Sequence, residues 1–227
     1  MQAPATIENR PHHLAQAATV THAGTHAGQR AAKEVRIARG QSLFYEGDRA
    51  DHFYEVLSGT LRCCRLIQDG RRQIYRFAGP GRMLGIGCHL RYGYSAEAVS
   101  DAVVRRHRLA DVDAHMATDE AMRRRVLQAL RDELAATRTQ MMLLGRLSAA
   151  ERLASFLLGL ARETPGADAC IELPMTRSDI ADYLGLTIET VSRKLHELRL
   201  LGLIRLDTPS RVRITDHDRI EALAEAA

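Results

Sequence analysis

Residues 176–202 read TRSDIADYLGLTIETVSRKLHELRLLG, and this stretch decides the fold of the C-terminal part of the chain. Thr176 and Asp179 have the spacing of a capping box, which predicts that a short helix begins here. The apolar positions of that helix share one face: Ile180, Ala181 and Leu184. Gly185 is placed to end it, and Leu186 follows at the corner. The stretch therefore starts with a short capped helix and a glycine turn.

A second helix follows the turn, with Thr187 as its predicted N-cap and Gly202 at its C-terminal end. Four apolar residues are expected to face the core: Val191, Leu195, Leu198 and Leu201. Two helices joined by a glycine-containing turn predict a helix-turn-helix. The outer face of the second helix then presents a polar set near its N-terminal half, where recognition helices meet base edges. These residues are Ile188, Glu189, Ser192, Arg193 and His196.

The outer face has the chemistry needed to read a major groove. Arg193 can donate two parallel hydrogen bonds to guanine, Glu189 can accept one from cytosine, and Ser192 can reach either a base or a methyl group. Further polar residues are expected to hold phosphates without specifying sequence: Arg177, Ser178, Thr190, Lys194 and Arg211. Thr187 at the start of the helix completes the predicted DNA-binding set. The alternative is an ordinary helix pair inside an enzyme, but caps, turn and outward polar residues all agree on the DNA reader.

A β-hairpin wing is predicted after the second helix. Residues 203–206 and 211–214 form its strands, and residues 207–210 form its turn. The segment 187–213 contains six basic and three acidic side chains, whereas 148–227 as a whole has 10 basic and 13 acidic ones. The DNA argument therefore depends on local pattern and not on total charge.

The preceding part of the chain is rich in short β-type runs. Between Val35 and Arg108 these runs alternate with glycine, Asp-Gly and Pro-Gly turns, which is typical of an all-β sandwich or barrel. The Asp69-Gly70 step predicts a hairpin between strands at 61–67 and 73–77. A further strand is expected over residues 98–109.

The pattern changes to helical between Asp119 and Arg146. Its apolar positions follow the three- and four-residue steps of a coiled-coil seam: Leu127, Leu130, Leu134, Thr137, Met141 and Leu144. A helix of about 40 Å is longer than the β-domain needs, so we expect a homodimer through this seam. The alternative is that the stripe packs on its own β-domain. Ser148 and Glu151 then fit a capping box for another helix, reaching Glu163.

At the recognition helix, Glu189-Thr-Val-Ser-Arg193 resembles the signature of Fnr-class regulators in the Crp-Fnr superfamily of bacterial transcription factors. Gly70-Arg-Arg-Gln-Ile74 and Leu143-Leu-Gly-Arg146 make the chain most similar to FixK-type members. The resemblance implies an α+β fold in which a tail is followed by three parts. These are a jelly roll of the cyclic-nucleotide-binding type over residues 34–117, a dimerisation helix over 118–147 and a winged helix-turn-helix over 148–227.

The same resemblance implies a function and partners. The dimer would recognise a palindrome with TTGAT-like half-sites in double-stranded DNA and recruit RNA polymerase, in oxygen-limitation or nitrogen-related gene control. The hairpin turn with Asp69, Gly70, Arg71 and Arg72 would contact the polymerase. Activity would be set by protein abundance or by a thiol switch.

The family's effector sites are altered in this chain. Its cyclic-AMP pocket uses a Gly-Glu and an Arg-Ser pair, but Ile86 follows Gly85 here and Tyr94 precedes Ser95, so both polar anchors are missing. The iron-sulfur members use N-terminal cysteines, and no cysteine precedes Val35. We expect no cofactor. The alternative is a sensor gated by a small molecule or by haem, with His89 or His107 as ligand.

Two cysteine arguments remain open. Cys170 precedes the helix-turn-helix and is either a redox reporter or a small buried hydrophobe. FixK-type relatives have their redox cysteine where this chain has Thr176, so a shared redox mechanism is in doubt. The other thiols, Cys63, Cys64 and Cys88, lack zinc-site spacing and are expected to be reduced and structural.

Composition excludes several classes of protein. The 227 residues carry a net charge of +4, with 45% hydrophobic and 26% charged residues, which is typical of a globular chain. No apolar run is long enough for a membrane span, so we expect a cytoplasmic protein. Residues 1–33 read as a mobile tail whose histidines (His12, His13, His22 and His26) lack partners for a metal. A cupin-type metalloenzyme would need clustered histidines, but His52, His89 and His107 are widely spaced, so no catalytic or metal-binding residue is predicted.

Overall fold

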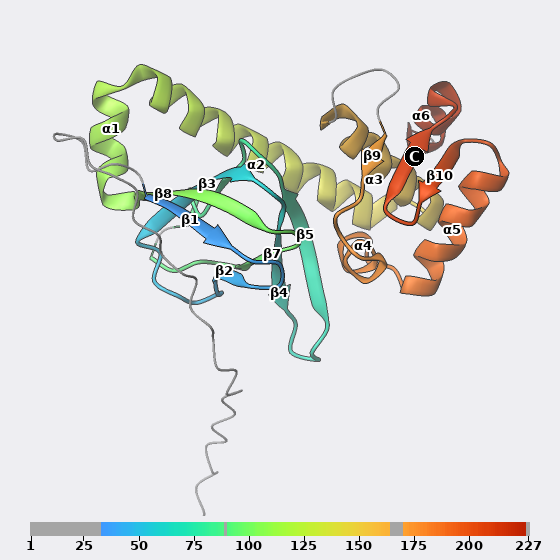
Figure 1. The fold of residues 1–227 in the computed structure, drawn as a ribbon, viewed down its shortest axis with the longest axis horizontal. Coiled ribbons are helices and arrows are strands. Elements are labelled where there is room, and N and C mark those ends of the chain that lie inside the picture. The colour runs from blue at the N-terminus through green and yellow to red at the C-terminus, as the bar shows by residue number, and fades with distance from the viewer. Residues whose placement is uncertain (1–32, 89, 164–169, 226–227) are drawn as a thin grey trace, which may run out of the picture.

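The computed structural model describes residues 33–88, 90–163 and 170–225 (Figure 1). A β-sandwich occupies the N-terminal half, the long helix α2 runs beside it, and a helical module with a small sheet sits at the far end of α2. The expected α+β architecture of jelly roll, long helix and helix-turn-helix is therefore confirmed. Residues 1–32 of the predicted tail, with its histidines, lie outside the described residues, as does His89, whereas Lys33 begins a strand.

The sandwich consists of two four-stranded antiparallel sheets, ordered β1-β8-β3-β6 and β2-β7-β4-β5. The strands are β1 (Lys33–Ile37), β2 (Ser42–Phe44), β3 (His52–Ser58), β4 (Leu61–Leu66), β5 (Arg72–Ala78), β6 (Met83–Leu84), β7 (Ser95–Ala98) and β8 (Ala102–Arg108). Asp69 and Gly70 lie in the turn between β4 and β5, as predicted, and Gly70 has a φ of 85°. Alternating inward residues such as Val56, Leu61 and Val104 fill the core between the sheets.

One strand prediction is wrong. The run expected over residues 98–109 is split into β7 and β8, which belong to different sheets. Ser100 and Asp101 make the crossing, because the Ser100 hydroxyl accepts from Thr60 N at 3.0 Å and the Asp101 carboxylate accepts from Arg39 N at 2.8 Å. Gly59 fits beneath this crossing with a φ of 79°, where a Cβ would lie 2.2 Å from Asp101 O. These side-chain bonds tie the crossing to the turns that precede β2 and β4.

Two helices follow the sandwich after a single 3₁₀ turn at Leu109–Asp111: α1 (Val112–Thr118) and α2 (Glu120–Arg146). The Asp119 carboxylate caps α2 by accepting from Met122 N at 3.0 Å, which gives the predicted long helix its start. Phe53 and Met83 on the sandwich pack against Val126 of α2. Buried Glu55 adds an ion pair to Arg125, so apolar and charged contacts together hold α2 along one sheet. In the part of the chain that the structure describes, no helix combines the length and apolar character that a membrane span requires.

The C-terminal module is built around a second hydrophobic cluster, which also includes Leu143 of α2 and Val99 of the sandwich. Its elements are α3 (Ala149–Glu163), β9 (Ile171–Glu172), α4 (Arg177–Leu184), α5 (Ile188–Leu200), β10 (Ile204–Thr208), β11 (Arg211–Ile214) and α6 (His217–Glu225). The predicted capping box of α3 forms, since Ser148 N donates to the Glu151 carboxylate at 2.7 Å. Leu153 and Leu157 of α3 pack against Leu184 and Val191, which places the helix-turn-helix over α3. Only the two residues Leu147 and Ser148 separate α2 from α3.

Candidate nucleic-acid interface

The first helix of the motif, α4, begins at the predicted capping box. Thr176 Oγ1 accepts from Asp179 N at 3.1 Å, and the Asp179 carboxylate accepts from Thr176 N at 3.0 Å. The predicted core residues Ile180, Ala181 and Leu184 are buried. Gly185 ends the helix in the left-handed region with a φ of 63°, and the chain then turns into α5.

The second helix, α5, is capped by Thr187, whose hydroxyl accepts from Thr190 N at 3.2 Å. Val191, Leu195 and Leu198 are buried as predicted. Leu201 was also expected in the core, but it is 56% exposed. The helix ends at Leu200 and Gly202 turns the chain, so Leu203 takes the core position and donates its amide to Leu198 O at 3.0 Å.

The predicted base-reading side chains all lie on the exposed face of α5. Ile188, Glu189, Ser192, Arg193 and His196 are exposed. The side chain of Arg193 is 64% exposed and has a single distant ion pair, Nε to Glu197 Oε1 at 4.0 Å, so its guanidinium is available to a base edge. The Glu189 backbone amide and then the Thr187 hydroxyl lower the pKa of Glu189 from its usual value, which keeps this carboxylate an acceptor at neutral pH.

The predicted phosphate-binding residues differ in how freely they are presented. Lys194 Nζ lies 2.6 Å from Glu197 Oε2, and exposed Arg211 pairs with Glu172 at 2.8 Å. Arg177 is half-buried and donates to Pro209 O at 2.7 Å, which ties the start of α4 to the turn of the wing. Burial lowers the pKa of Arg177. Ser178 and Thr190 are also half-buried.

The wing is a three-stranded sheet with the order β10-β11-β9. The two predicted strands pair as an antiparallel hairpin, with Ile204 opposite Ile214. The third strand, β9, joins through Val212 opposite Ile171. Its addition connects the segment before α4 to the wing, so the wing and the helix-turn-helix form one unit.

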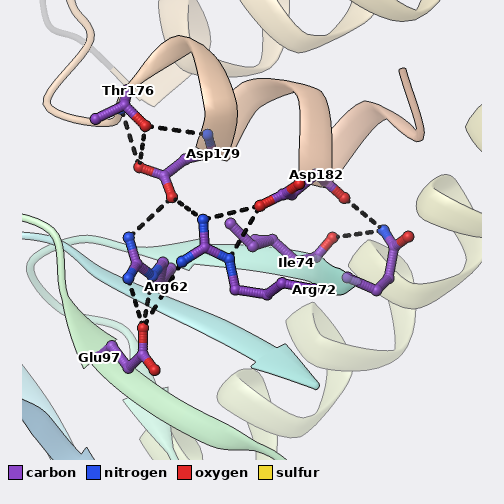
Figure 2. A network of polar contacts seen from close by, with 8 residues as sticks. Arg62, Arg72, Ile74, Glu97, Thr176, Asp179 and Asp182 are labelled. Atoms are coloured by element: carbon purple, nitrogen blue, oxygen red, sulfur yellow. Dashed lines mark hydrogen bonds and ion pairs between the residues drawn. The ribbon is translucent and has the colours of Figure 1, made fainter. Parts of the chain in front are cut away.

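A set of polar contacts that the sequence did not predict connects α4 to the β-sandwich (Figure 2). Arg62 of β4 and Arg72 of β5 both donate to Asp179 Oδ1, at 2.8 and 2.7 Å. Arg72 also reaches Asp182 Oδ2 at 2.8 Å. Gln73 Nε2 donates to Asp182 O at 2.8 Å. The sequence signal at Asp179 was only that of a helix cap, and nothing local marked its partners more than 100 residues away.

This contact changes how the predicted polymerase-contact residues are presented. Asp69 and Arg71 are exposed at the tip of the β4–β5 hairpin, where they form an ion pair at 2.7 Å, and Gly70 lies between them. Arg72 is placed differently, because its guanidinium is directed to Asp179 and Asp182.

The predicted seam of α2 is open to solvent along most of its length. Leu127, Leu130 and Leu134 are exposed, and Met141 is 70% exposed. Thr137 is exposed as well, and its hydroxyl donates to Glu133 O at 2.8 Å. Leu144 is half-buried because it packs against the C-terminal core. Most of the stripe is thus not used by the chain's own β-domain.

The interior of the sandwich is occupied by aromatic side chains. Phe44 stacks on Tyr92 with ring centroids 3.8 Å apart, and Tyr75 meets Tyr94 edge to face at 5.3 Å. The Tyr94 hydroxyl accepts from Gly85 N at 2.8 Å. His107 lies outside this core, stacked on Phe53 at 4.6 Å. Among the described residues, no group of three or more His, Cys, Asp or Glu side chains could hold a metal ion.

Comparison with known proteins agrees with this architecture. Residues 34–119 match the cyclic nucleotide-binding domain, and residues 151–223 match the Crp-like helix-turn-helix domain. Over 204 residues the chain is 40% identical to the nitrogen fixation regulation protein FixK of Bradyrhizobium diazoefficiens, covering 88% of this chain and 84% of that protein. The chain belongs to the Crp-Fnr family of transcription regulators.

Two further relatives show where the chain stands within the Crp-Fnr family. The transcriptional activatory protein AadR of Rhodopseudomonas palustris is 40% identical over 202 residues, covering 87% of this chain and 84% of that protein. The solved structure of FixK2 from Bradyrhizobium japonicum superimposes with a TM-score of 0.80 at 34% identity, covering 86% of this chain and 98% of that chain. This single superposition covers both the sandwich and the helix-turn-helix, so the two domains are placed similarly relative to each other in the two proteins. The resemblance to FixK-type regulators is confirmed.

Proposed function

We propose that this Crp-Fnr regulator is a cytoplasmic homodimer that reads an inverted repeat with TTGAT-like half-sites. The observation that carries the proposal is the exposed face of α5, where Arg193, Ser192 and Glu189 stand beside one another outside a well-packed core. Arg193 would bind guanine, and Glu189 would accept from the cytosine amino group. Phosphates would be contacted by Arg177, Ser178, Thr190, Lys194 and Arg211, which would orient the helix.

The exposed stripe of α2 supports the dimer. Leu127, Leu130, Leu134 and Met141 follow the spacing of a heptad seam and are exposed to solvent. A matching stripe from a second copy would cover them and place two α5 helices about one turn of DNA apart, roughly 34 Å. A twofold protein requires a twofold site, which is why we propose an inverted repeat.

We further propose that the bound dimer activates transcription by contacting RNA polymerase with the exposed hairpin tip at Asp69, Gly70 and Arg71. Its targets would be genes of oxygen limitation or nitrogen metabolism, as the name of the FixK relative suggests. Arg72 is directed into the contact with α4, and we assign it no role in the polymerase contact.

The alternative, a regulator gated by a small molecule or haem inside the jelly roll, has less support. Tyr94 bonds to Gly85 where the family's nucleotide anchors would stand, and stacked aromatic rings fill the interior beside it. The ungated reader is therefore the proposed function. A haem band in the absorbance spectrum of the purified protein, or a change of DNA affinity on adding a ligand, would favour the gated version.

The experiment that tests the proposed function measures the mass of the protein in solution and its affinity for DNA. We expect a dimer by sedimentation and binding to an inverted TTGAT repeat about 10³-fold tighter than to a scrambled duplex. A monomer with equal affinity for both duplexes would contradict the proposal. Transcription by purified polymerase, with Arg71→Ala as variant, tests the polymerase contact separately from DNA affinity.

A further inference from the structure

Four side chains join the reading module to the sandwich, and we call them the ionic clamp: Arg62, Arg72, Asp179 and Asp182. Two guanidiniums from neighbouring strands converge on one carboxylate oxygen of Asp179, and Arg72 bridges from there to Asp182 (Figure 2). Glu97 of β7 supports the other side by accepting from Arg62 at 2.6 Å. The clamp and Glu97 together thus connect three sandwich strands to α4.

The burial of the clamp indicates that its role is orientation. Asp179 is 1% exposed, and both guanidiniums are largely covered. A buried ion pair adds little net stability over an apolar contact of the same size, because both charges lose water. It does impose direction, since the planar guanidinium fork donates to carboxylates only at fixed angles. An apolar patch alone would let α4 slide over the sandwich, whereas the clamp fixes their relative position.

The opposite end of α4 is held to the dimerisation helix. Gln140 of α2 donates to Tyr183 O at 2.7 Å, and Arg152 of α3 donates to Leu184 O at 2.9 Å and to Leu144 O at 3.0 Å. These bonds occupy carbonyls at the ends of α4 and α2. With the clamp at its start and these bonds at its end, α4 is attached at both ends, and α5 packs directly upon it.

Without the clamp, the module would keep its fold, the two-residue junction Leu147–Ser148, the hydrogen bonds of Gln140 and Arg152, and the ring contacts of Phe77 on β5 with Phe156 and Tyr183. Its hydrophobic core contains residues of α3, α4, α5, α6 and the wing together with Leu143 of α2 and Val99 of the sandwich, and no clamp side chain belongs to it, although Asp179 is buried beside it. Loss of the clamp would therefore loosen the placement of α5 against α2 and leave the surface of α5 unchanged.

We infer that Arg62, Arg72 and Asp182 are positioning residues that set the spacing between the two half-sites this dimer accepts. The inference rests on the proposed function. Each half-site is read by α5 alone, whereas the distance between the two α5 helices depends on how each module is held to its sandwich and its α2. Clamp variants should read the same bases but tolerate more than one spacer.

The test uses the full chain and inverted repeats whose central spacer varies by one base pair at a time, with a single half-site as reference. Arg72→Gln and Asp182→Asn remove clamp charges, and Arg72→Lys keeps the charge without the fork. Arg65→Gln is the matched control. Arg65 also lies on β4, but it is exposed and pairs with Glu46 of the same β-domain, so it makes no ion pair to α4. Thermal melting checks that each variant is folded.

For wild type and Arg65→Gln we expect one spacer to be preferred over its neighbours by at least about tenfold. For Arg72→Gln and Asp182→Asn we expect that preference to fall to about threefold or less, with half-site affinity within about twofold of wild type and Arg72→Lys in between. A sharp spacer preference that survives in both variants overturns the clamp's role and leaves the proposed function standing. A wild type that binds repeat and scrambled DNA equally overturns both.

Discussion

Nη2 of Arg72 lies 2.7 Å from Oδ1 of Asp179, although the two residues are 107 positions apart in the chain. Asp179 thereby serves two structures, as the partner of Thr176 in the capping box of α4 and as the acceptor of two arginines from the sandwich. Its carboxylate therefore takes part both in the capping of α4 and in the contact between α4 and the sandwich.

Replacing Asp179 should be costly for stability. Asp179→Ala removes half of the capping box and leaves Arg62 and Arg72 without a shared acceptor in a mostly covered site. We expect the free energy of unfolding to fall by about 2 to 3 kcal/mol, below the 3 to 5 typical of a fully buried pair because Glu97 and Asp182 remain. Urea denaturation followed by circular dichroism measures it. Asp69→Ala, at an exposed ion pair, should leave the midpoint unchanged.

The same carboxylate predicts a pH dependence. Burial by itself raises the pKa of Asp179, but bonds from Thr176 and the charges of Arg62 and Arg72 outweigh it and hold the pKa below the usual 3.8. Since the folded pKa lies below the unfolded one, its stabilisation is complete above about pH 5 and is lost as the pH falls through the folded pKa. The difference in unfolding free energy between wild type and Asp179→Asn should be constant from pH 7 to about 5 and then shrink. A difference that grows in acid would contradict this assignment.

Arg193 and Lys194 are neighbours with different proposed roles. Arg193→Ala should cost about 1 to 3 kcal/mol on the cognate site and relax preference at one guanine position. Lys194→Ala should weaken all sequences alike and reduce the slope of log affinity against log salt by about 1. Binding titrations on single-base variants of the half-site, at several salt concentrations, separate these effects. Identical profiles for the two variants would argue against the division of roles.

The exposed stripe of α2 predicts that a charge placed in the seam disrupts the dimer. Leu134→Glu would place a carboxylate in the seam, where burial against a partner helix penalises it. We expect sedimentation to show mostly monomer and affinity for the inverted repeat to drop by more than about tenfold. Ala121→Glu adds the same charge at an exposed position of α2 outside the stripe, and it should remain dimeric. A dimeric Leu134→Glu protein would mean that the subunits meet elsewhere.

Thiol reactivity should divide the cysteines into two pairs. Burial raises the pKa of Cys63 to about 12 and that of Cys64 to about 11. At pH 8 fewer than about one in a thousand of these thiols would be ionised, so iodoacetamide should spare both. Cys88 and Cys170 are partly exposed and should be labelled first. Mass spectrometry of peptides gives the order, and in denaturant all four should react.

Much of the fold was predictable because its signals are local. The capping boxes at Thr176 and Ser148, the glycine at 185 and the Asp69-Gly70 turn each depend on residues a few positions apart, and all were found in the structure. The two errors have different causes, the first local and the second tertiary. Leu201 was counted into the helix face although Gly202 turns the chain, and residues 98–109 were read as one strand although Ser100 and Asp101 carry the chain between sheets.

The sequence by itself determined the chemistry of the reading face, because helical spacing alone places Glu189, Ser192 and Arg193 on the same side of α5. Only the tertiary structure decided where that face is held. The arginines of β4 and β5 meet Asp179 and Asp182 through folding of the whole chain, and Arg72 looked like part of an exposed hairpin until its partners were in place. The side of a helix on which a side chain lies depends only on its spacing from neighbouring residues. Contacts between domains join residues that are far apart in the chain, and no local pattern identifies them.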